Sequence, residues 1–249
     1  MIGIGGVSMS GIAEMLKSWG FTVTGTDANL SPIIRKLQRS GIYVRVGSDF
    51  ENLAKADIVV YTVAVKQDDP ELVKARELGI PTIERADFLG KITTCFEDTI
   101  GVSGTHGKTT TTSMISCCFL RANMDPNIQV GAILKQINGN YRIGKSEYFI
   151  LEACEYRRHF LSYDPQYVVI TNIEMDHTDY YKSMDDMILA YEEFANKADK
   201  MVIACGDDPY THSLEVNPQI FYYGLNEDND FIAKNIKVTG HHSKTSGNK

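Results

Sequence analysis

Residues 104–110 combine glycine, lysine and threonine in an order suited to binding the phosphates of a nucleotide. The segment reads Gly104-Thr105-His106-Gly107-Lys108-Thr109-Thr110, and it follows an apolar run and precedes a helical pattern. Backbone N–H groups at a helix start can face phosphate oxygens, Lys108 would bring positive charge to the outer phosphates, and the Thr109 hydroxyl could ligate Mg²⁺. The strict phosphate-loop pattern places a glycine where this chain has Val102. We predict phosphate binding here, and a plain glycine turn with a solvated lysine is the less favoured alternative.

Two further polar loci follow apolar runs in the same half of the chain. Glu152 follows Tyr148–Leu151, and Asp176-His177 comes a few residues after Tyr167–Thr171. If these runs are parallel strands, their carboxyl ends share one edge of the sheet, so we expect Lys108, Glu152 and His177 to converge there. A carboxylate and a neutral imidazole beside a triphosphate suit one or two Mg²⁺ ions. Taken singly, a glutamate at a strand end is more often a surface residue than a metal ligand, and a lone histidine is more often simply hydrogen-bonded.

A second glycine turn opens the chain and precedes an acidic residue at dinucleotide-binding spacing. The turn contains Gly3, Gly5 and Gly6, and Asp27 follows about 20 residues later, after a second apolar run. Ser8 stands where the third glycine of that fingerprint would be. These features predict that Gly3, Gly5, Gly6 and Asp27 bind a substrate through the phosphates of some nucleotide.

The elements that position these residues alternate between strand-like and helix-like patterns. In the first half, short apolar runs alternate with helix-length segments such as Ser10–Trp19, and Ser31-Pro32 is a plausible start for a helix through Leu37. The predicted strands of this half are Ile2–Ile4, Phe21–Thr24, Tyr43–Val46 and Ile58–Tyr61. This order favours an α/β fold with crossover helices, and we predict a Rossmann-like domain over residues 1–97.

The second half repeats this pattern after the polar pair Glu97-Asp98. Helical patterns over Thr109–Leu120 and Met184–Ala198 separate several short runs that look like buried parallel strands. Those runs are Thr99–Ser103, Tyr148–Leu151, Tyr167–Thr171 and Lys200–Cys205. We predict a P-loop α/β domain with a mostly parallel sheet over residues 98–239. The small, polar and basic residues 240–249 predict a disordered tail.

Composition narrows the class of protein. The chain has 249 residues, 43% of them hydrophobic, and a formal net charge of −7, which argues against a nucleic-acid partner. No apolar run approaches the roughly 18 residues of a membrane span, so no membrane partner is expected. The five cysteines are odd in number and lack metal-ligand spacing. With no secretory signal pattern at the start, these features favour a cytoplasmic location.

The motifs together resemble those of the Mur ligases, cytoplasmic enzymes of peptidoglycan precursor synthesis. The resemblance runs from Met1 to about Asn235. Its marks are Gly3-Ile4-Gly5-Gly6 with Met9-Ser10-Gly11, Gly104 to Thr112, Glu152-Ala153-Cys154-Glu155, and Thr171-Asn172-Ile173-Glu174-Met175-Asp176-His177. The resemblance implies that the first unit binds a UDP-sugar and the second binds Mg·ATP, with Lys108 on the phosphates and Thr109, Glu152 and His177 around the metals. The absent first glycine is usual in this family.

The resemblance also implies the reaction. ATP would phosphorylate the carboxylate of UDP-N-acetylmuramate, and the amine of L-alanine would attack the acyl phosphate. Relatives carry a third domain, which this chain does not reach, so we expect the chain alone to bind nucleotide weakly and to ligate poorly, and a separate C-terminal ligase domain is a possible partner. Ser48 stands where many relatives have a histidine near the uridine.

Other interpretations stay open at this point. A related ligase that recycles murein tripeptide shares much of the pattern, and a non-catalytic fragment that binds UDP-sugar would also fit. Asn196-Lys197-Ala198-Asp199 matches a GTPase tetrapeptide, but it closes a helical pattern instead of following a strand. A nicotinamide-dependent oxidoreductase would use only the first glycine turn.

Overall fold

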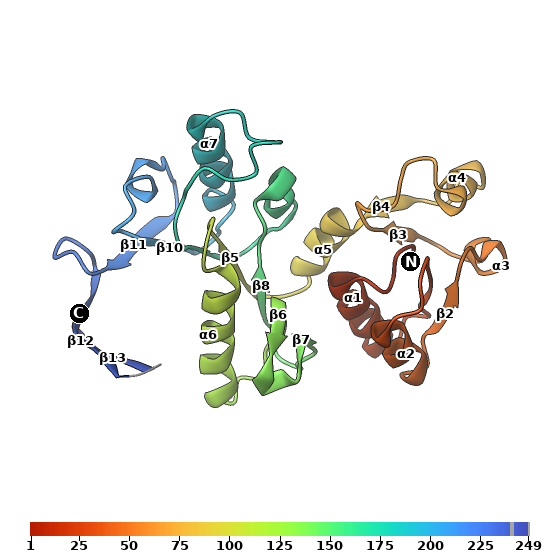
Figure 1. The fold of residues 1–249 in the computed structure, drawn as a ribbon, viewed down its shortest axis with the longest axis horizontal. Coiled ribbons are helices and arrows are strands. Elements are labelled where there is room, and N and C mark those ends of the chain that lie inside the picture. The colour runs from red at the N-terminus through yellow and green to blue at the C-terminus, as the bar shows by residue number, and fades with distance from the viewer. Residues whose placement is uncertain (240–241, 249) are drawn as a thin grey trace. The chain divides into compact units, whose positions relative to one another are not determined.

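The chain divides into two compact units, each with its own sheet and core. The structure, a computed structural model, describes residues 1–239 and 242–248. One unit comprises Met1–Ile92 with Ile133–Ile143, and the other comprises Thr93–Ala132 with Gly144–Lys249 (Figure 1). The sequence places one boundary after residue 97, whereas Ile133–Ile143 groups with the first unit because Tyr141 packs there against Gly11 and donates a hydrogen bond to the Met15 sulfur at 3.2 Å.

The first unit is built on short parallel strands. β1 (Thr24–Asp27) pairs with β2 (Tyr43–Val46), and β3 (Val59–Tyr61) pairs with β4 (Thr82–Glu84), both in parallel. Ile2 forms parallel bridges to Thr26 and Tyr61 and so joins the two pairs. The helices are α1 (Val7–Ser18), α2 (Pro32–Arg39), α3 (Phe50–Leu53), α4 (Pro70–Glu77) and α5 (Arg85–Thr93). β7 (Gly139–Arg142) also falls within this unit's residues.

Local sequence explains where the helices of this unit begin. The Ser31 hydroxyl accepts a hydrogen bond from the Ile34 N–H at 3.2 Å, and Pro32 fits the first helical turn, as predicted. Ile34 and Leu37 then bury their side chains with Ile4 and Val44 in one cluster. This cluster lies beneath the glycine turn and supports it.

Two predicted strands of this unit are wrong. In Ile2–Ile4 only Ile2 forms isolated bridges, and Gly3 and Ile4 lie in a turn. The run Phe21–Thr24 was expected to be extended, but the strand is Thr24–Asp27. Gly20 ends α1 with φ +92°, and Phe21 is 60% exposed, so this apolar residue contributes little to the core.

The second unit has a mostly parallel sheet, which confirms the predicted α/β class. Its strand order is β13-β12-β11-β10-β9-β5-β8-β6, with all pairs from β12 to β6 parallel and β12–β13 antiparallel. The strands are β5 (Asp98–Ser103), β6 (Asn127–Leu134), β8 (Tyr148–Glu152), β9 (Tyr167–Ile170), β10 (Met201–Cys205), β11 (Gln219–Gly224), β12 (Phe231–Thr239) and β13 (His242–Asn248). The 3-10 segments are η1 (Lys135–Ile137), η2 (Tyr156–Ser162) and η3 (Thr211–Ser213).

Two helices cover this sheet, and buried apolar side chains fill the space beneath them. α6 (Lys108–Arg121) runs alongside β5 and β8, and α7 (Met184–Ala195) packs near η2 (Figure 1). Phe160 stacks on Phe194 with ring centroids 4.6 Å apart and meets Tyr191 edge-on at 5.5 Å. This packing joins η2 to α7, while parallel pairing of β5 with β8 and β9 brings their carboxyl ends to one edge.

The predicted disordered tail differs from the structure. His242–Asn248 forms β13, which pairs with β12, whereas residues 240–241 and 249 lie outside the described residues. Main-chain hydrogen bonds can hold an edge strand without an apolar side-chain pattern, so composition alone did not indicate it. In the described part of the chain, no helix is both long and apolar enough to cross a membrane.

Candidate active site

The loop between β5 and α6 depends on two glycines in unusual backbone conformations. Gly104 has φ +136° and Gly107 has φ +82°, values that residues with a side chain rarely adopt. A Cβ at Gly104 would also collide with the Thr171 hydroxyl. α6 begins directly after this turn, at Lys108, so its first N–H groups lie at the loop.

The end of β9 holds this loop through several hydrogen bonds. The Thr105 N–H donates to the Asn172 carbonyl at 3.1 Å, and the His106 N–H donates to Asn172 Oδ1 at 2.9 Å. The Thr171 hydroxyl donates to the His106 carbonyl at 2.6 Å. Thr105 Oγ1 accepts a bond from the Glu174 N–H at 2.8 Å. The loop is therefore fixed in shape by its own unit.

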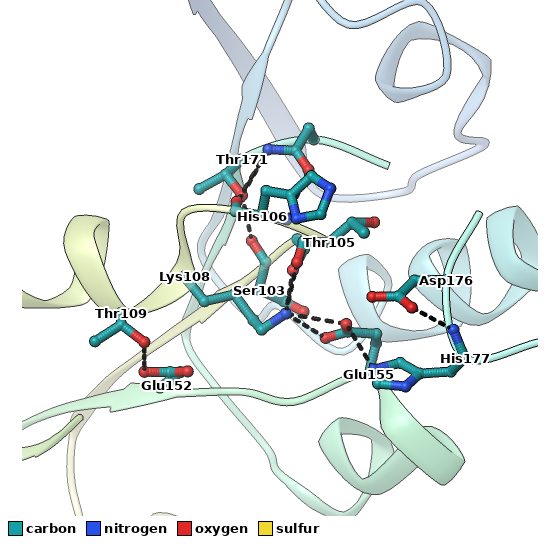
Figure 2. Close-up of polar contacts among 12 residues, drawn as sticks. Ser103, Thr105, His106, Lys108, Thr109, Glu152, Glu155, Thr171, Asp176 and His177 are labelled. Carbon is teal, nitrogen blue, oxygen red and sulfur yellow. Dashed lines mark hydrogen bonds and ion pairs between the residues drawn. The ribbon is translucent and has the colours of Figure 1, made fainter. Parts of the chain in front are cut away.

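Lys108 bends back over this loop towards a buried acid (Figure 2). Its Nζ donates to the carbonyls of Gly104 at 2.6 Å and Thr105 at 3.0 Å, and to Glu155 Oε1 at 2.9 Å. The Glu155 side chain is fully buried, whereas 15% of the Lys108 side chain is exposed. The ammonium group thus has an anionic partner already in place.

Glu152 lies on the other side of Lys108 in Figure 2, where it contacts the first turn of α6. The Thr109 hydroxyl donates to Glu152 Oε2 at 2.8 Å, and the Gly131 N–H donates to the same oxygen at 2.7 Å. A Cβ at Gly131 would lie 2.7 Å from that oxygen, so glycine leaves room for the carboxylate. A hydroxyl and a carboxylate in contact form an oxygen donor pair of the kind that Mg²⁺ prefers.

His177 reaches the same buried acid from the segment after β9. Its Nε2 lies 3.5 Å from Glu155 Oε1, and its backbone N–H donates to Asp176 Oδ1 at 2.6 Å. One potential ligand atom from each of Glu155, Asp176 and His177 lies within 4.8 Å of the other two. His177 has φ +50°, and its ring packs against Tyr156 with centroids 4.6 Å apart. With this strained backbone the imidazole lies beside Glu155 and Tyr156.

The segment after Glu155 contains two consecutive left-handed residues. Arg157 has φ +53° and Arg158 has φ +56°. Arg158 forms ion pairs with Asp186 at 2.8 Å and Glu193 at 3.1 Å, and both acids belong to α7. The Tyr181 hydroxyl donates to the Glu155 carbonyl at 2.6 Å. These contacts turn the chain sharply, directly behind Glu155.

The electrostatic environment at this edge is acidic. Burial raises the pKa of Tyr191 well above its ordinary value, and the nearby Glu155 carboxylate raises it further. Tyr191 is therefore a neutral hydroxyl at physiological pH. An anion that binds here would lie near the carboxylates of Glu152, Glu155 and Asp176, and Lys108 is the cation beside the loop.

The structure brings together most of the residues that the sequence singled out. Lys108 and His177 both contact Glu155, and Thr109 contacts Glu152. His106 is largely exposed and lies 3.6 Å from Glu174, and Thr110 is exposed on α6. Sequence reasoning assigned no role to Glu155, although its spacing of three residues from Glu152 within a short acidic motif could have indicated it.

The first unit holds the other predicted set around a pocket of about 810 Å³. Gly3, Gly5, Gly6 and Asp27 all line this pocket. The Asp27 carboxylate accepts the Gly5 N–H at 2.9 Å and the Asn29 N–H at 3.2 Å. Asp27 therefore holds the glycine turn in shape while it borders the pocket.

Comparison with known families matches both units. Residues 1–96 match the profile "Mur ligase family, catalytic domain", and residues 102–248 match "Mur ligase middle domain". The chain belongs to the Mur ligase family. Two similar curated Mur ligases are named UDP-N-acetylmuramate–L-alanine ligase. The one from Acetivibrio thermocellus is 48% identical over 92% of this chain and 50% of its own length, and the one from Clostridium botulinum is 46% identical over 95% and 52%.

Solved structures of Mur ligases share the fold. A UDP-N-acetylmuramate-alanine ligase from Thermotoga maritima superposes with a TM-score of 0.85 at 27% identity, covering 100% of this chain and 57% of that one. A UDP-N-acetylmuramate:L-alanyl-gamma-D-glutamyl-meso-diaminopimelate ligase from Neisseria meningitides gives 0.82 at 26% identity, covering 93% and 78%. The chain spans about half the length of the curated relatives it matches.

Proposed function

We propose that this chain carries the ATP-binding and UDP-sugar-binding parts of a ligase that joins L-alanine to UDP-N-acetylmuramate. One observation supports this proposal above all: Lys108 of the glycine loop lies at one sheet edge between Glu155 and Glu152, the second of which contacts Thr109. The names of relatives 46–48% identical support the choice of substrates. We assign the enzyme to the cytoplasm, as the resemblance to the Mur ligases implies.

In this proposal the phosphates of ATP lie against residues 104–110. Backbone N–H groups at the start of α6 face the phosphate oxygens, and Lys108 places its ammonium group on the outer phosphates. Hydrogen bonds to Thr171 and Asn172 hold the loop before any ligand arrives. The loop therefore reorganises little on binding.

The donor set fits magnesium at two places. Thr109 and Glu152 would hold one ion, and His177 with its acidic neighbours would hold a second. When bound, Mg²⁺ offsets phosphate charge and keeps the reacting oxygens in line. The Gly131 N–H keeps the Glu152 carboxylate oriented towards Thr109.

The proposed chemistry proceeds in two steps. A carboxylate oxygen of UDP-N-acetylmuramate attacks the γ-phosphorus of ATP, and the bond to the β-phosphate oxygen breaks, which leaves ADP and an acyl phosphate. The amine of L-alanine then attacks the acyl carbon, loses a proton, and inorganic phosphate leaves with the bonding electrons. The residues of this chain position the phosphates and stabilise charge during the first step.

The pocket of the first unit is the proposed binding site of the UDP-sugar. Its volume of about 810 Å³ suits a nucleotide-sized ligand, and Gly3, Gly5 and Gly6 let backbone atoms approach a diphosphate. Asp27 fixes the turn by accepting the Gly5 N–H.

Calorimetric titration tests both halves of the proposal separately. We expect the purified chain to bind ATP in the presence of MgCl₂ and to bind UDP-N-acetylmuramate, and we expect Lys108→Ala to abolish the first without changing the second. Lys74→Ala is the matched control, because Lys74 pairs with Glu77 on the surface of the other unit. Normal Mg·ATP binding by Lys108→Ala would contradict the assignment.

A further inference from the structure

Glu155 has a contact pattern that the proposed roles of the other residues do not explain. Both of its carboxylate oxygens lie 2.9 Å from Lys108 Nζ, and the side chain is fully buried. Oε1 accepts the hydrogen bond, whereas Oε2 has no hydrogen bond to any described residue despite its equal distance. The carboxylate therefore occupies the side of Lys108 that an anionic ligand would need.

A phosphate that approaches Lys108 would compete with this carboxylate. If the ammonium group turned to the phosphate, Glu155 would remain buried without its cation, and an unpaired buried charge is strongly unfavourable. The Tyr181 and Tyr191 hydroxyls also lie near Glu155 but stay neutral. The titratable groups closest to its carboxylate are His177, with Nε2 3.5 Å from Oε1, and Asp176, which belongs to the same cluster. A cation beside His177 would restore the balance of charge.

We propose that Glu155 is a positioning residue that takes the place of a phosphate on Lys108 and makes polyphosphate binding depend on magnesium. This inference rests on the proposed function of the loop. Glu155 and the carbonyls of Gly104 and Thr105 together hold the Lys108 side chain folded over the loop. When a polyphosphate and Mg²⁺ bind together, the Lys108 ammonium group pairs with the phosphate. The Glu155 carboxylate is then balanced by the cation beside His177. Neither ligand binds well without the other.

A purely structural role for Glu155 predicts a different effect of removing its carboxylate on ligand binding. In that case, removing the carboxylate would lower stability and weaken every ligand in the same proportion. A charge-competition role predicts opposite changes: tighter binding of polyphosphate without metal, and a smaller gain from adding metal. The ratio of the two affinities therefore separates the roles.

The experiment is calorimetric titration with inorganic tripolyphosphate, and in parallel with ATP, in EDTA and in MgCl₂. We expect Glu155→Gln to bind tripolyphosphate in EDTA at least about tenfold more tightly than the unmodified chain, since one nearby negative charge is gone. The advantage that MgCl₂ gives should shrink by a similar factor. Glu147→Gln, in front of the opposite end of β8, removes an equal charge and should change neither value.

A second control separates Glu155 from the other acid at the site. Glu152→Gln should weaken binding in MgCl₂ without strengthening it in EDTA, because Glu152 bonds Thr109 and Gly131 and does not contact Lys108. Glu155→Asp covers the case in which Glu155→Gln does not fold. It keeps the charge but shortens the reach to Lys108, and it should tighten tripolyphosphate binding in EDTA by about threefold.

The outcomes are distinct. Equal or weaker EDTA affinity in the folded Glu155 variants would overturn the inference, as would an equal gain in Glu147→Gln. Failure of the unmodified chain to bind Mg·ATP would instead count against the proposed function, while the tripolyphosphate titrations would still decide the role of Glu155.

Discussion

Lys108 Nζ and the Glu155 carboxylate form a buried ion pair, with 2.9 Å between the nitrogen and each oxygen. The pair joins the start of α6 to the segment after β8, so it crosses the strand edge where the loop residues gather. The pair matters most for Glu155, because its side chain is fully buried and water cannot replace the lysine. This dependence gives the first prediction.

Lys108→Met should destabilise the second unit by about 3–5 kcal/mol, because it leaves the Glu155 charge buried and unpaired. Adding Glu155→Gln to Lys108→Met should recover most of that loss, since no charge is then left without a partner. Urea unfolding at pH 7 measures both variants. A double variant as unstable as Lys108→Met would show that the pair is not the cause.

Glu152→Gln should raise the MgCl₂ concentration needed for half-maximal ATP binding by about tenfold, because a charged oxygen ligand is lost. Thr109→Val should act in the same direction, since it removes the hydroxyl that contacts Glu152. Thr109→Ser keeps the hydroxyl and serves as the control. A magnesium titration that is unchanged in Glu152→Gln would mean that this acid only orders the loop.

Gly5→Ala should cost about 1–2 kcal/mol and weaken UDP-N-acetylmuramate binding, because the new Cβ displaces a hydrogen-bonded carboxylate. That Cβ would lie 2.8 Å from Asp27 Oδ2, the atom that accepts the Gly5 N–H. Gly6→Ala is the matched control for stability, since its nearest neighbour, the Gly3 carbonyl oxygen, would be an ordinary 3.5 Å away. Thermal unfolding should therefore shift only for Gly5→Ala.

Asp49→Asn should destabilise the first unit at pH 7 and lose this effect in acid. The Asn52 side chain donates to Asp49 at 2.7 Å and holds the pKa of that carboxyl below its ordinary value. A lowered pKa means that the ionised form stabilises the fold above the unfolded pKa of about 3.9, and that this contribution disappears as the pH falls through the folded value. Urea unfolding at pH 7, 5 and 3 should show the gap between variant and parent closing below about pH 4. A constant gap would contradict the charge explanation.

Much of the scaffold could be predicted from residue patterns. Tyr43–Val46 is a strand as predicted, and α6 and α7 begin within one residue of the helical patterns. α7 has a recognisable start, because the Ser183 hydroxyl accepts the Asp186 N–H, and it buries Met187 and Phe194. β1 could not be placed, because Thr24-Gly25-Thr26-Asp27 has no apolar residue, and Gly25 is required by close packing against Ile4.

The candidate site was only partly predictable. The glycine loop at residues 104–110, Glu152 and His177 follow recognisable strands, so their common edge could be predicted from parallel pairing. Glu155 lies beyond the strand end, where no periodic pattern exists. Its burial depends on the left-handed turn at Arg157 and Arg158 and on the Tyr181 hydrogen bond, which no local pattern indicates.

Left-handed backbone at Arg157 and Arg158 has a consequence for mobility. Each residue is held about 1–2 kcal/mol above its relaxed conformation, so the segment would unwind if its ends were not tied. The ion pairs of the Arg158 guanidinium fix one end to α7. The hydrogen bond from the Tyr181 hydroxyl to the Glu155 carbonyl fixes the other end. Removing either contact would let this strained segment relax, and the Glu155 carboxylate would then move away from Lys108.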